Sequence, residues 1–342
     1  MQLTLVRPDD WHLHLRDGSR LESVVKHSAA QFRRALVMPN LVPAVETVEQ
    51  ALAYRGRILA AAGDSGFEPL MTLYLTPRTS PAEVRLAALD PHVHAVKLYP
   101  AGATTNSDAG IQSLEAVFPV LEAMAEVGLP LCIHGEVTDA GVDIFDREAR
   151  FVADVLGPLS ERFAELPIVL EHVTTKDAVD FVRAARAGVA ATITAHHLLY
   201  NRNALFRGGI RPDYYCLPVL KRESHRKALV EAATSGDPRF FLGTDSAPHA
   251  RSTKYAACGC AGLYTAHAAL PLYVQAFESA GALQRLEAFA SHFGADFYGV
   301  PRNSETLTLR REPWQVPAEY AFGDESLTPL CAGETLAWRV LG

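Results

Sequence analysis

The sequence predicts an α/β fold, a (β/α)8 TIM barrel, and three observations predict it. Short β-rich runs alternate with longer amphipathic stretches along the chain. Strand–helix units of this kind, eight in about 250 residues, match the usual length of such a barrel. Almost every run ends in a polar or reactive side chain. A doubly wound open sheet is the alternative, because near-continuous apolar strands suit both folds. No G-x-G-x-x-G follows the first run, which argues against a dinucleotide-binding sheet.

The predicted strands are short apolar runs that follow one another at regular spacing. They cover residues 11–15, 35–40, 70–76, 94–100, 129–136, 166–175, 189–197 and 239–249.

Three of the intervening stretches show clear helical spacing. Residues 45–63 place apolar side chains three and four apart and end in glycine, which is a stop signal. Residues 112–128 repeat this pattern, with a kink expected at Pro119. Residues 175–188 open with a threonine cap and again end in glycine.

Composition is that of an ordinary globular protein. The 342 residues are 49% hydrophobic, and the formal net charge is −7. No basic tract is present, so neither nucleic acid nor an anionic membrane is expected as a partner. The first residues lack the apolar run of a signal peptide, and no stretch of about 18 apolar residues suggests a membrane span.

The cysteines and the C-terminal residues complete this outline. The five cysteines are scattered, which indicates free thiols in the reducing cytoplasm. Cys258 and Cys260 lack a second pair that would complete a soft-metal site, so we interpret them as loop or packing residues. Residues 1–342 are expected to form one barrel domain, with the proline-rich residues from about 300 to 342 as a tail that wraps the barrel.

The first predicted strand contains two histidines, His12 and His14, two positions apart. Alternation along a strand sends them to one face and sends Trp11 and Leu13 to the other. Two imidazoles in one small volume favour a shared metal ion, because neutral imidazole is a metal ligand. A half-exposed strand with two solvated histidines is the alternative.

Polar side chains at the other strand ends extend this pattern. In a barrel all carboxyl ends of the strands meet at one mouth, so residues far apart in sequence converge there. A single histidine after an apolar strand is more often an interior residue than a ligand. The joint pattern is harder to explain in that way, and it comprises His12, His14, Asn40, Thr76, Lys97, His134, His172, His197 and Asp245.

The remaining histidines are interpreted as structural or surface residues. These are His27, His92, His94, His225, His267 and His292. His196 and His197 are ambiguous, because adjacent residues at a strand end face opposite sides and at most one of them can point inward.

Four imidazoles and one carboxylate exceed the needs of one tetrahedral Zn²⁺ with an open position. They suit two ions if an anionic ligand bridges them. A desolvated, neutral Lys97 can react with CO2 to form a carbamate with carboxylate-like oxygens. The alternatives for Lys97 are an ion pair at the barrel mouth and a Schiff-base lysine, which the surrounding metal-type ligands argue against.

These motifs together resemble a known family. "DWHLHLRDG", "VMPNL", "KLYPAGATTNS", "HGEV", "EHVTTKDA" and "LGTDSAPHA" are similar to the motifs of the dihydroorotases of the compact single-domain bacterial type, in the amidohydrolase superfamily. The resemblance implies a metal-dependent hydrolase barrel with two Zn²⁺ per subunit, in a cytoplasmic homodimer. It implies the reversible cyclisation of N-carbamoyl-L-aspartate to (S)-dihydroorotate and water in de novo pyrimidine (UMP) biosynthesis.

The resemblance also implies a role for each ligand. One ion would take His12, His14, Asp245 and Lys97 as N6-carboxylysine. The second would share Lys97 and take His134 and His172. A hydroxide that bridges the metals would be the nucleophile, and Asp245 would be the general acid and base.

The substrate carries a carboxylate, which a guanidinium can bind with two hydrogen bonds. Arg16 follows His14 in the same alternation and therefore faces the site. By resemblance, Asn40 and His249 bind the same carboxylate, and backbone atoms near Leu217 and Ala261 hold the amide edge of the ring. His134 also counts among the substrate contacts. By resemblance, Thr104 and Thr105 would close over the substrate. Without the resemblance, a flexible connection is the preferred interpretation of residues 101–110.

Other classes of protein are alternatives. Deaminases of the superfamily generally work with one metal and lack a lysine at the position of Lys97. Hydantoinases and dihydropyrimidinases share the ligand set, but they usually begin with an extra β-rich segment that pairs with C-terminal strands. With the first histidine at position 12, no room for that segment is expected. A non-catalytic metal-binding barrel would not need a carboxylate clamp at Arg16, Asn40 and His249.

Overall fold

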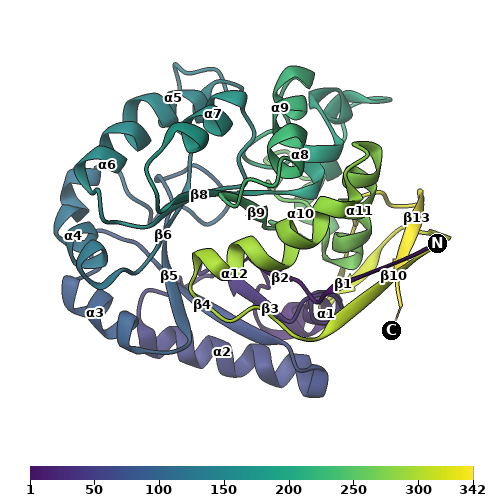
Figure 1. Ribbon diagram of the computed structural model, residues 1–342, viewed down its shortest axis with the longest axis horizontal. Coiled ribbons are helices and arrows are strands. Elements are labelled where there is room, and N and C mark those ends of the chain that lie inside the picture. The colour runs from purple at the N-terminus through teal and green to yellow at the C-terminus, as the bar shows by residue number, and fades with distance from the viewer. Residues whose placement is uncertain (342) are drawn as a thin grey trace.

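The computed structural model of the protein describes residues 1–341, and its centre is an eight-stranded parallel sheet (Figure 1). Neighbouring strands follow chain order from β2 to β9. Each strand lies within or overlaps one of the eight predicted runs. The strands are β2 (Asp9–Leu13), β3 (Arg34–Val37), β4 (Glu68–Tyr74), β5 (Val93–Leu98), β6 (Leu131–His134), β7 (Ile168–Glu171), β8 (Val189–Ile193) and β9 (Phe240–Leu242).

The sheet closes on itself where its first and last strands meet. The Asp245 amide donates a hydrogen bond to the His12 carbonyl at 2.9 Å, and the His14 amide donates to the Ser246 carbonyl at 3.1 Å. An open sheet would leave these edges apart, so the doubly wound alternative is wrong and the predicted barrel is confirmed. The seam of the barrel passes through three of the predicted metal ligands.

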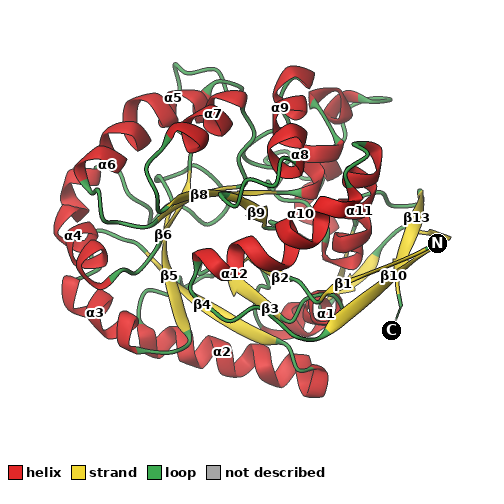
Figure 2. Ribbon diagram, in the orientation of Figure 1, coloured by secondary structure: helices red, strands yellow, loops and turns green. Residues whose placement is uncertain are grey.

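Helices surround the strands, as Figure 2 shows. They cover the outer face of the sheet, as expected of strand–helix units. Their bounds are α1 (Gly18–Ala29), α2 (Val48–Ala62), α3 (Pro81–Leu89), α4 (Phe118–Val127), α5 (Arg147–Phe151), α6 (Gly157–Arg162), α7 (Lys176–Ala184), α8 (Ala195–Leu199), α9 (Glu223–Thr234), α10 (Arg251–Lys254), α11 (Ala269–Ser279) and α12 (Phe293–Phe297).

The predicted helices exist, with two corrections at their ends. In α4, Pro119 lies in the first turn, after a 3-10 turn at Leu114–Val117, so it starts the helix rather than kinking it. In α7, Thr175 is the expected cap and accepts from the Ala178 amide, but the helix ends at Ala184. The predicted end at Gly188 is wrong because Ala185 already has an extended backbone, with ψ 160°.

The interior of the barrel is filled by one inward-facing residue or pair from each strand, including Trp11, Ala95 and Phe241. Tyr298, which follows α12, stacks on Trp11 with ring centroids 4.5 Å apart. The prediction that Trp11 shares a face with Leu13 is wrong, since Leu13 packs in the outer core between strands and helices. The register of β2 against β3 shifts between Asp10 and Leu13, and this irregularity interrupts the alternation.

The two chain ends meet in a second, antiparallel sheet (right side of Figure 1). Its order is β1 (Gln2–Val6), β10 (Thr306–Gln315) and β13 (Thr335–Val340). A hairpin of β11 (Tyr320–Phe322) and β12 (Glu325–Leu327) lies between β10 and β13 in sequence. The expectation that residue 12 leaves no room for a preceding paired strand is therefore wrong, because five residues are enough to form one.

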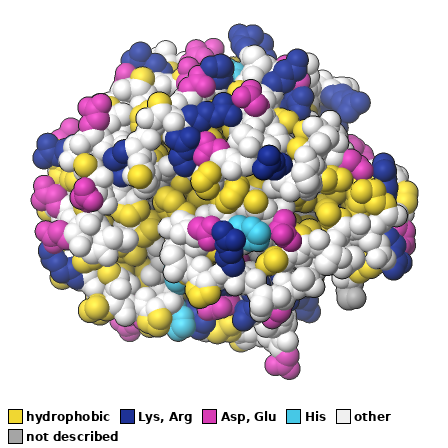
Figure 3. Space-filling view, in the orientation of Figure 1, with side chains coloured by type: hydrophobic (Ala, Val, Ile, Leu, Met, Phe, Trp, Pro, Cys, Tyr) yellow, Lys and Arg dark blue, Asp and Glu magenta, His cyan; other side chains and the backbone are white. Residues whose placement is uncertain are grey.

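Surface charge follows the composition. On the face drawn in Figure 3, basic and acidic side chains are interspersed among apolar ones rather than gathered by sign. Among residues 1–341, no helix combines the length and apolar character needed to cross a bilayer.

Candidate metal centre and active site

The predicted site residues converge at the carboxyl ends of the barrel strands. Most of them line one small cavity. Of the strand-end residues singled out, Thr76 and His197 do not line it, and Lys97 is fully buried and is also absent from the lining. The lining residues are His12, His14, Arg16, Asn40, Tyr99, Thr104, Thr105, His134, His172, Leu217, Asp245, Ala247, Ala261 and Gly262.

The first group of candidate ligands joins β2 to the end of β9. The Nε2 atoms of His12 and His14 lie 3.1 Å apart. Asp245 Oδ1 lies 3.4 Å from His12 Nε2 and 3.2 Å from His14 Nε2. Two imidazole nitrogens and one carboxylate oxygen that converge in this way form a donor set suited to zinc.

An oxygen lies close to the far-side nitrogen of each of these rings. His12 Nδ1 lies 3.0 Å from Glu171 Oε1, and His14 Nδ1 is hydrogen-bonded to Asn40 Oδ1 at 2.8 Å. Histidines that bind metals almost always have such a partner on the other ring nitrogen. The arrangement therefore leaves Nε2 of both histidines for a cation.

The second group brings His134 and His172 beside the first. The His172 ring lies between those of His12 and His134, with centroids 5.0 and 4.9 Å away. His134 Nε2 pairs with Glu136 Oε2 at 2.9 Å, which leaves its Nδ1 free to act as a ligand. His172 Nδ1 is buried without a partner among residues 1–341, as expected of a nitrogen that awaits a cation.

Lys97, on β5, is linked to the first group through Glu171. Its Nζ is hydrogen-bonded to Glu171 Oε2, and the other oxygen of that carboxylate lies 3.0 Å from His12 Nδ1. Its side chain is fully buried, and burial lowers its pKa to about 7. Burial thus disfavours the ammonium form relative to the uncharged amine, which is the form that reacts with CO2. Sequence reasoning missed Glu171, although its position directly before His172 at the end of β7 was an available signal.

Two aspartates hold the seam of the barrel. Burial acts to raise the pKa of Asp245, but His12, His14 and His172 outweigh it and hold that pKa well below its usual range. Asp245 is therefore ionised. Asp10, which sequence reasoning also missed, accepts hydrogen bonds from the Thr244 amide at 2.8 Å and hydroxyl at 2.6 Å. This contact fixes β2 against the residues that lead to Asp245.

Backbone strain is concentrated at the cavity. Arg16, His172 and Asp245 have φ angles of 64°, 44° and 44°, in the left-handed region that non-glycine residues avoid. Each such residue costs about 1–3 kcal/mol and persists where the surroundings impose it, most often at functional sites.

Arg16 is held so that part of its guanidinium faces the cavity. Its Nε donates to the Pro248 carbonyl at 2.9 Å, and Nη2 donates to His249 Nε2 at 3.0 Å. The Tyr54 hydroxyl donates to the Arg16 carbonyl at 2.6 Å. His249 lies behind Arg16, in an adjoining pocket, so its direct contact with a substrate stays a prediction.

The segment 101–110 lies closed over the cavity. The Thr105 hydroxyl donates to the Ala261 carbonyl at 3.2 Å, and Asn40 Nδ2 donates to the Thr105 carbonyl at 3.1 Å. Asn106 Nδ2 donates to the Asn40 carbonyl at 3.1 Å. These contacts place Thr104 and Thr105 in the roof of the cavity.

A buried lysine that sequence reasoning missed supports the opposite wall. Lys254 Nζ donates to the carbonyls of Tyr215, Cys260 and Gly262 at 2.9, 3.0 and 2.8 Å. It thereby connects the segment that carries Leu217 with the segment that carries Ala261.

None of the histidines interpreted as structural or surface residues lines the cavity. These are His27, His92, His94, His225, His267 and His292. The expectation for His196 and His197 is wrong, because they lie on helix α8 and are both buried. Thr194 caps this helix by accepting from the His197 amide, so strand geometry does not apply to the pair.

Comparisons with known proteins agree with this geometry. The profile of the amidohydrolase family matches residues 4–327. The dihydroorotase of Cupriavidus taiwanensis is 64% identical over 339 residues, which cover 99% of this chain and 98% of that protein. The dihydroorotase of Laribacter hongkongensis is 63% identical over 342 residues, with 99% of each chain covered.

Solved structures show the same relationship. The crystal structure of dihydroorotase from Campylobacter jejuni has a TM-score of 0.92 at 35% identity, over 100% of this chain and 98% of that one. A Saccharomyces cerevisiae dihydroorotase in complex with 5-fluoroorotic acid has a TM-score of 0.91 at 35% identity, over 99% and 98% of the two chains. The L-hydantoinase of Arthrobacter aurescens, at 16% identity and a TM-score of 0.82, shares the fold.

Full-length identity and a shared barrel lead to one assignment. The chain belongs to the amidohydrolase family and, within it, to the dihydroorotases, which are metal-dependent hydrolases acting on a cyclic amide.

Proposed function

We propose that this chain interconverts N-carbamoyl-L-aspartate and (S)-dihydroorotate at a centre of two Zn²⁺ ions bridged by carboxylated Lys97, in the pathway to UMP. One observation carries the proposal. Two groups of imidazoles and Asp245 line the same cavity as Arg16, and Lys97 is connected to them through Glu171.

The residues present fit such a centre. His12, His14, Asp245 and the carbamate of Lys97 would hold one ion, and the same carbamate with His134 and His172 would hold the other. The unpartnered His172 nitrogen and the near-neutral pKa of Lys97 support this assignment. When bound, the two cations supply an activated water as nucleophile and polarise the carbonyl that it attacks.

Asp245 acts as the general acid and base. It is ionised and lies within 3.4 Å of both His12 and His14. In ring opening, its carboxylate accepts the proton of the attacking water and then gives that proton to the leaving amide nitrogen. In ring closure it takes the proton from that nitrogen and returns it to the departing water.

The cavity walls recognise the substrate. Arg16 and Asn40 bind its carboxylate, with His249 orienting Arg16 from behind. Backbone groups of Leu217 and Ala261 face the amide edge of the ring, and His134 lines the same space. The Saccharomyces cerevisiae relative binds 5-fluoroorotic acid, a planar ring with a carboxylate, which supports a ligand of this kind here.

Thr104 and Thr105 cover the bound substrate and exclude bulk water. Their segment is already connected to Asn40 and Ala261 across the cavity. The structure thus suits a roof that must open for the substrate to enter.

The proposal extends to the whole chain. We take residues 1–342 as one domain, with the C-terminal tail contributing β10 to β13, and the enzyme as a homodimer in the cytoplasm. Five free cysteines support a reducing compartment.

Metal depletion and restoration test the function. Chelated, metal-free protein should not hydrolyse dihydroorotate, and Zn²⁺ should restore turnover. Hydantoin and dihydrouracil, which lack the carboxylate, serve as competing substrates. Full activity without metal would refute the metal centre. Faster turnover of either competitor would refute the substrate assignment in favour of another cyclic-amide hydrolase.

A further inference from the structure

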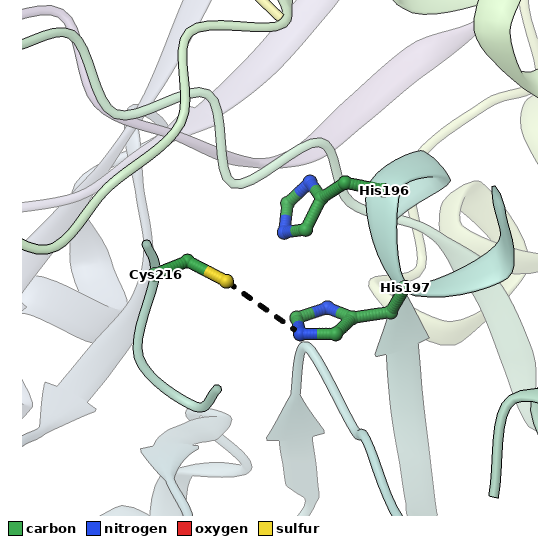
Figure 4. Close-up of side chains that lie close together, drawn as sticks. All are labelled: His196, His197 and Cys216. Carbon is green, nitrogen blue, oxygen red and sulfur yellow. Dashed lines mark hydrogen bonds between the residues drawn. The ribbon is translucent and has the colours of Figure 1, made fainter. Parts of the chain in front are cut away.

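A second cluster of metal-type ligands lies outside the lining of the catalytic cavity. His196 and His197, on α8, face Cys216, which lies in the connection between α8 and α9 (Figure 4). All three side chains are buried, and one ligand atom from each lies within 4.8 Å of the others. None of them is needed for the proposed reaction.

His196 has no polar partner for its ring. Both its nitrogens are buried without a hydrogen bond among residues 1–341. Burial lowers its pKa to about 4, so the ring is neutral and keeps one lone pair available. Buried polar atoms in native proteins are nearly always satisfied, so this ring indicates a ligand that the cluster is built to take.

His197 and Cys216 share one acceptor. His197 Nε2 lies 3.1 Å from the Pro218 carbonyl, and the Cys216 thiol donates to the same oxygen at 3.3 Å. His197 Nδ1 lies 2.8 Å from the Thr194 hydroxyl. If the ring proton moves to Nδ1, Thr194 can accept it, and Nε2 becomes free to bind a cation with its outer nitrogen already oriented.

The spacing of sulfur and nitrogen fits a tetrahedral ion. Cys216 Sγ lies 3.9 Å from His197 Nε2. Zinc bonds of about 2.3 Å to sulfur and about 2.0 Å to nitrogen place tetrahedral neighbours roughly 3.5 Å apart, so small side-chain movements suffice. Sulfur and imidazole select zinc-like ions, whereas Ca²⁺ and Mg²⁺ require oxygen ligands.

We propose that His196, His197 and Cys216 form a third cation site, separate from the binuclear centre, that takes Zn²⁺ or a similar borderline-soft divalent ion. Binding replaces the thiol proton, which leaves to solvent, by a sulfur–metal bond, and no electrons are transferred. An ion held there would connect α8 to the segment that leads into Leu217 at the cavity wall.

Cobalt titration tests the site, in enzyme that holds two Zn²⁺ per chain, which is enough for the binuclear centre and leaves the third site empty. A cobalt–thiolate bond gives a charge-transfer absorption band in the near ultraviolet, and none of the proposed binuclear ligands contains sulfur. Wild-type enzyme should develop this band as it takes up about one Co²⁺ per chain. Cys216→Ala and His196→Gln should each lose the band and that equivalent of metal, whereas Cys258→Ser, which alters an exposed cysteine, should keep both.

The outcomes that would overturn the proposal are equally specific. They are the absence of a thiolate band in the wild type, its persistence in Cys216→Ala, or its loss in Cys258→Ser. Because His196→Gln leaves the thiol intact, it decides the matter even if Cys216→Ala folds poorly. The readout does not depend on turnover, so it stands or fails independently of the proposed reaction.

Discussion

Replacing Arg16 with glutamine should impair catalysis while leaving the metals in place. The guanidinium has five N–H donors. Two of them are used, by Nε to Pro248 and by Nη2 to His249, and 5 − 2 leaves three for the cavity. A substrate carboxylate would take two of those three. Each charge-assisted hydrogen bond contributes about 1.5–3 kcal/mol, so together they contribute about 3–6 kcal/mol.

That loss corresponds to a decrease in kcat/KM of about 10²–10⁴. Glutamine can still donate one neutral hydrogen bond, so we expect the lower end of the range. The assay is steady-state hydrolysis of dihydroorotate, with metal content measured on the same preparation. Arg20→Gln is the matched control, because Arg20 is half-exposed and pairs with Glu325 away from the cavity.

Unchanged kcat/KM in Arg16→Gln, within about threefold, would remove Arg16 from the site, since that is under 1 kcal/mol. A loss of metal in the same variant would also contradict the reasoning, because Arg16 would then support the ligands rather than the substrate.

Three further predictions concern residues that contact the ligands or the cavity wall. Glu171→Gln should weaken zinc binding about 10–100-fold in chelator competition, because Glu171 orients His12; unchanged affinity would exclude that role. Lys254→Met should lower the free energy of unfolding in urea by about 1–3 kcal/mol and raise KM, because three carbonyls lose their donor; wild-type values of both would contradict it. At fixed dissolved CO2, reactivation of metal-free enzyme should accelerate as pH rises through about 7 and then level off, because burial lowers the pKa of Lys97 to about 7 and deprotonation is complete above it. An ordinary lysine, with a pKa near 10.4, would instead give rates that climb to about pH 10.

The barrel, and the gathering of the candidate metal ligands at its mouth, could be predicted from the sequence because both depend on local patterns. Several candidate ligands lie in or directly after an apolar run, namely His12, Lys97, His134 and His172. Because the carboxyl ends of barrel strands meet at one mouth, these side chains are expected to lie together. The proposed substrate contacts needed the resemblance to a family, because residues such as Leu217 and Ala261 are proposed to act through backbone atoms, which no side-chain pattern reveals.

The residues that could not be identified from the sequence contact partners that are far away along the chain. Asp10 holds Thr244, 234 positions away, and Glu171 reaches Lys97 across 74 positions. Neither pairing has a signature in either segment alone. A buried carboxylate is identified only once the fold shows what surrounds it.

The wrong predictions about the fold arise where strand alternation, a local pattern, is interrupted by irregular pairing or by a helix cap. The irregular pairing of β2 with β3 moved Trp11 out of alternation. The Thr194 cap started a helix where a continued strand was expected, and so placed both His196 and His197 in the core. The short strand β1 gains its stability from pairing with β10 at the other end of the chain.

The central claim is that Lys97 carries a CO2-derived carbamate between two cations. Carbon-13 NMR of enzyme reconstituted with zinc and ¹³C-labelled bicarbonate tests it most directly. We predict a carbamate resonance in the wild type that is absent from Lys97→Ala, together with loss of bound zinc in that variant. A fully active wild-type enzyme with two zinc ions and no carbamate resonance would contradict the account.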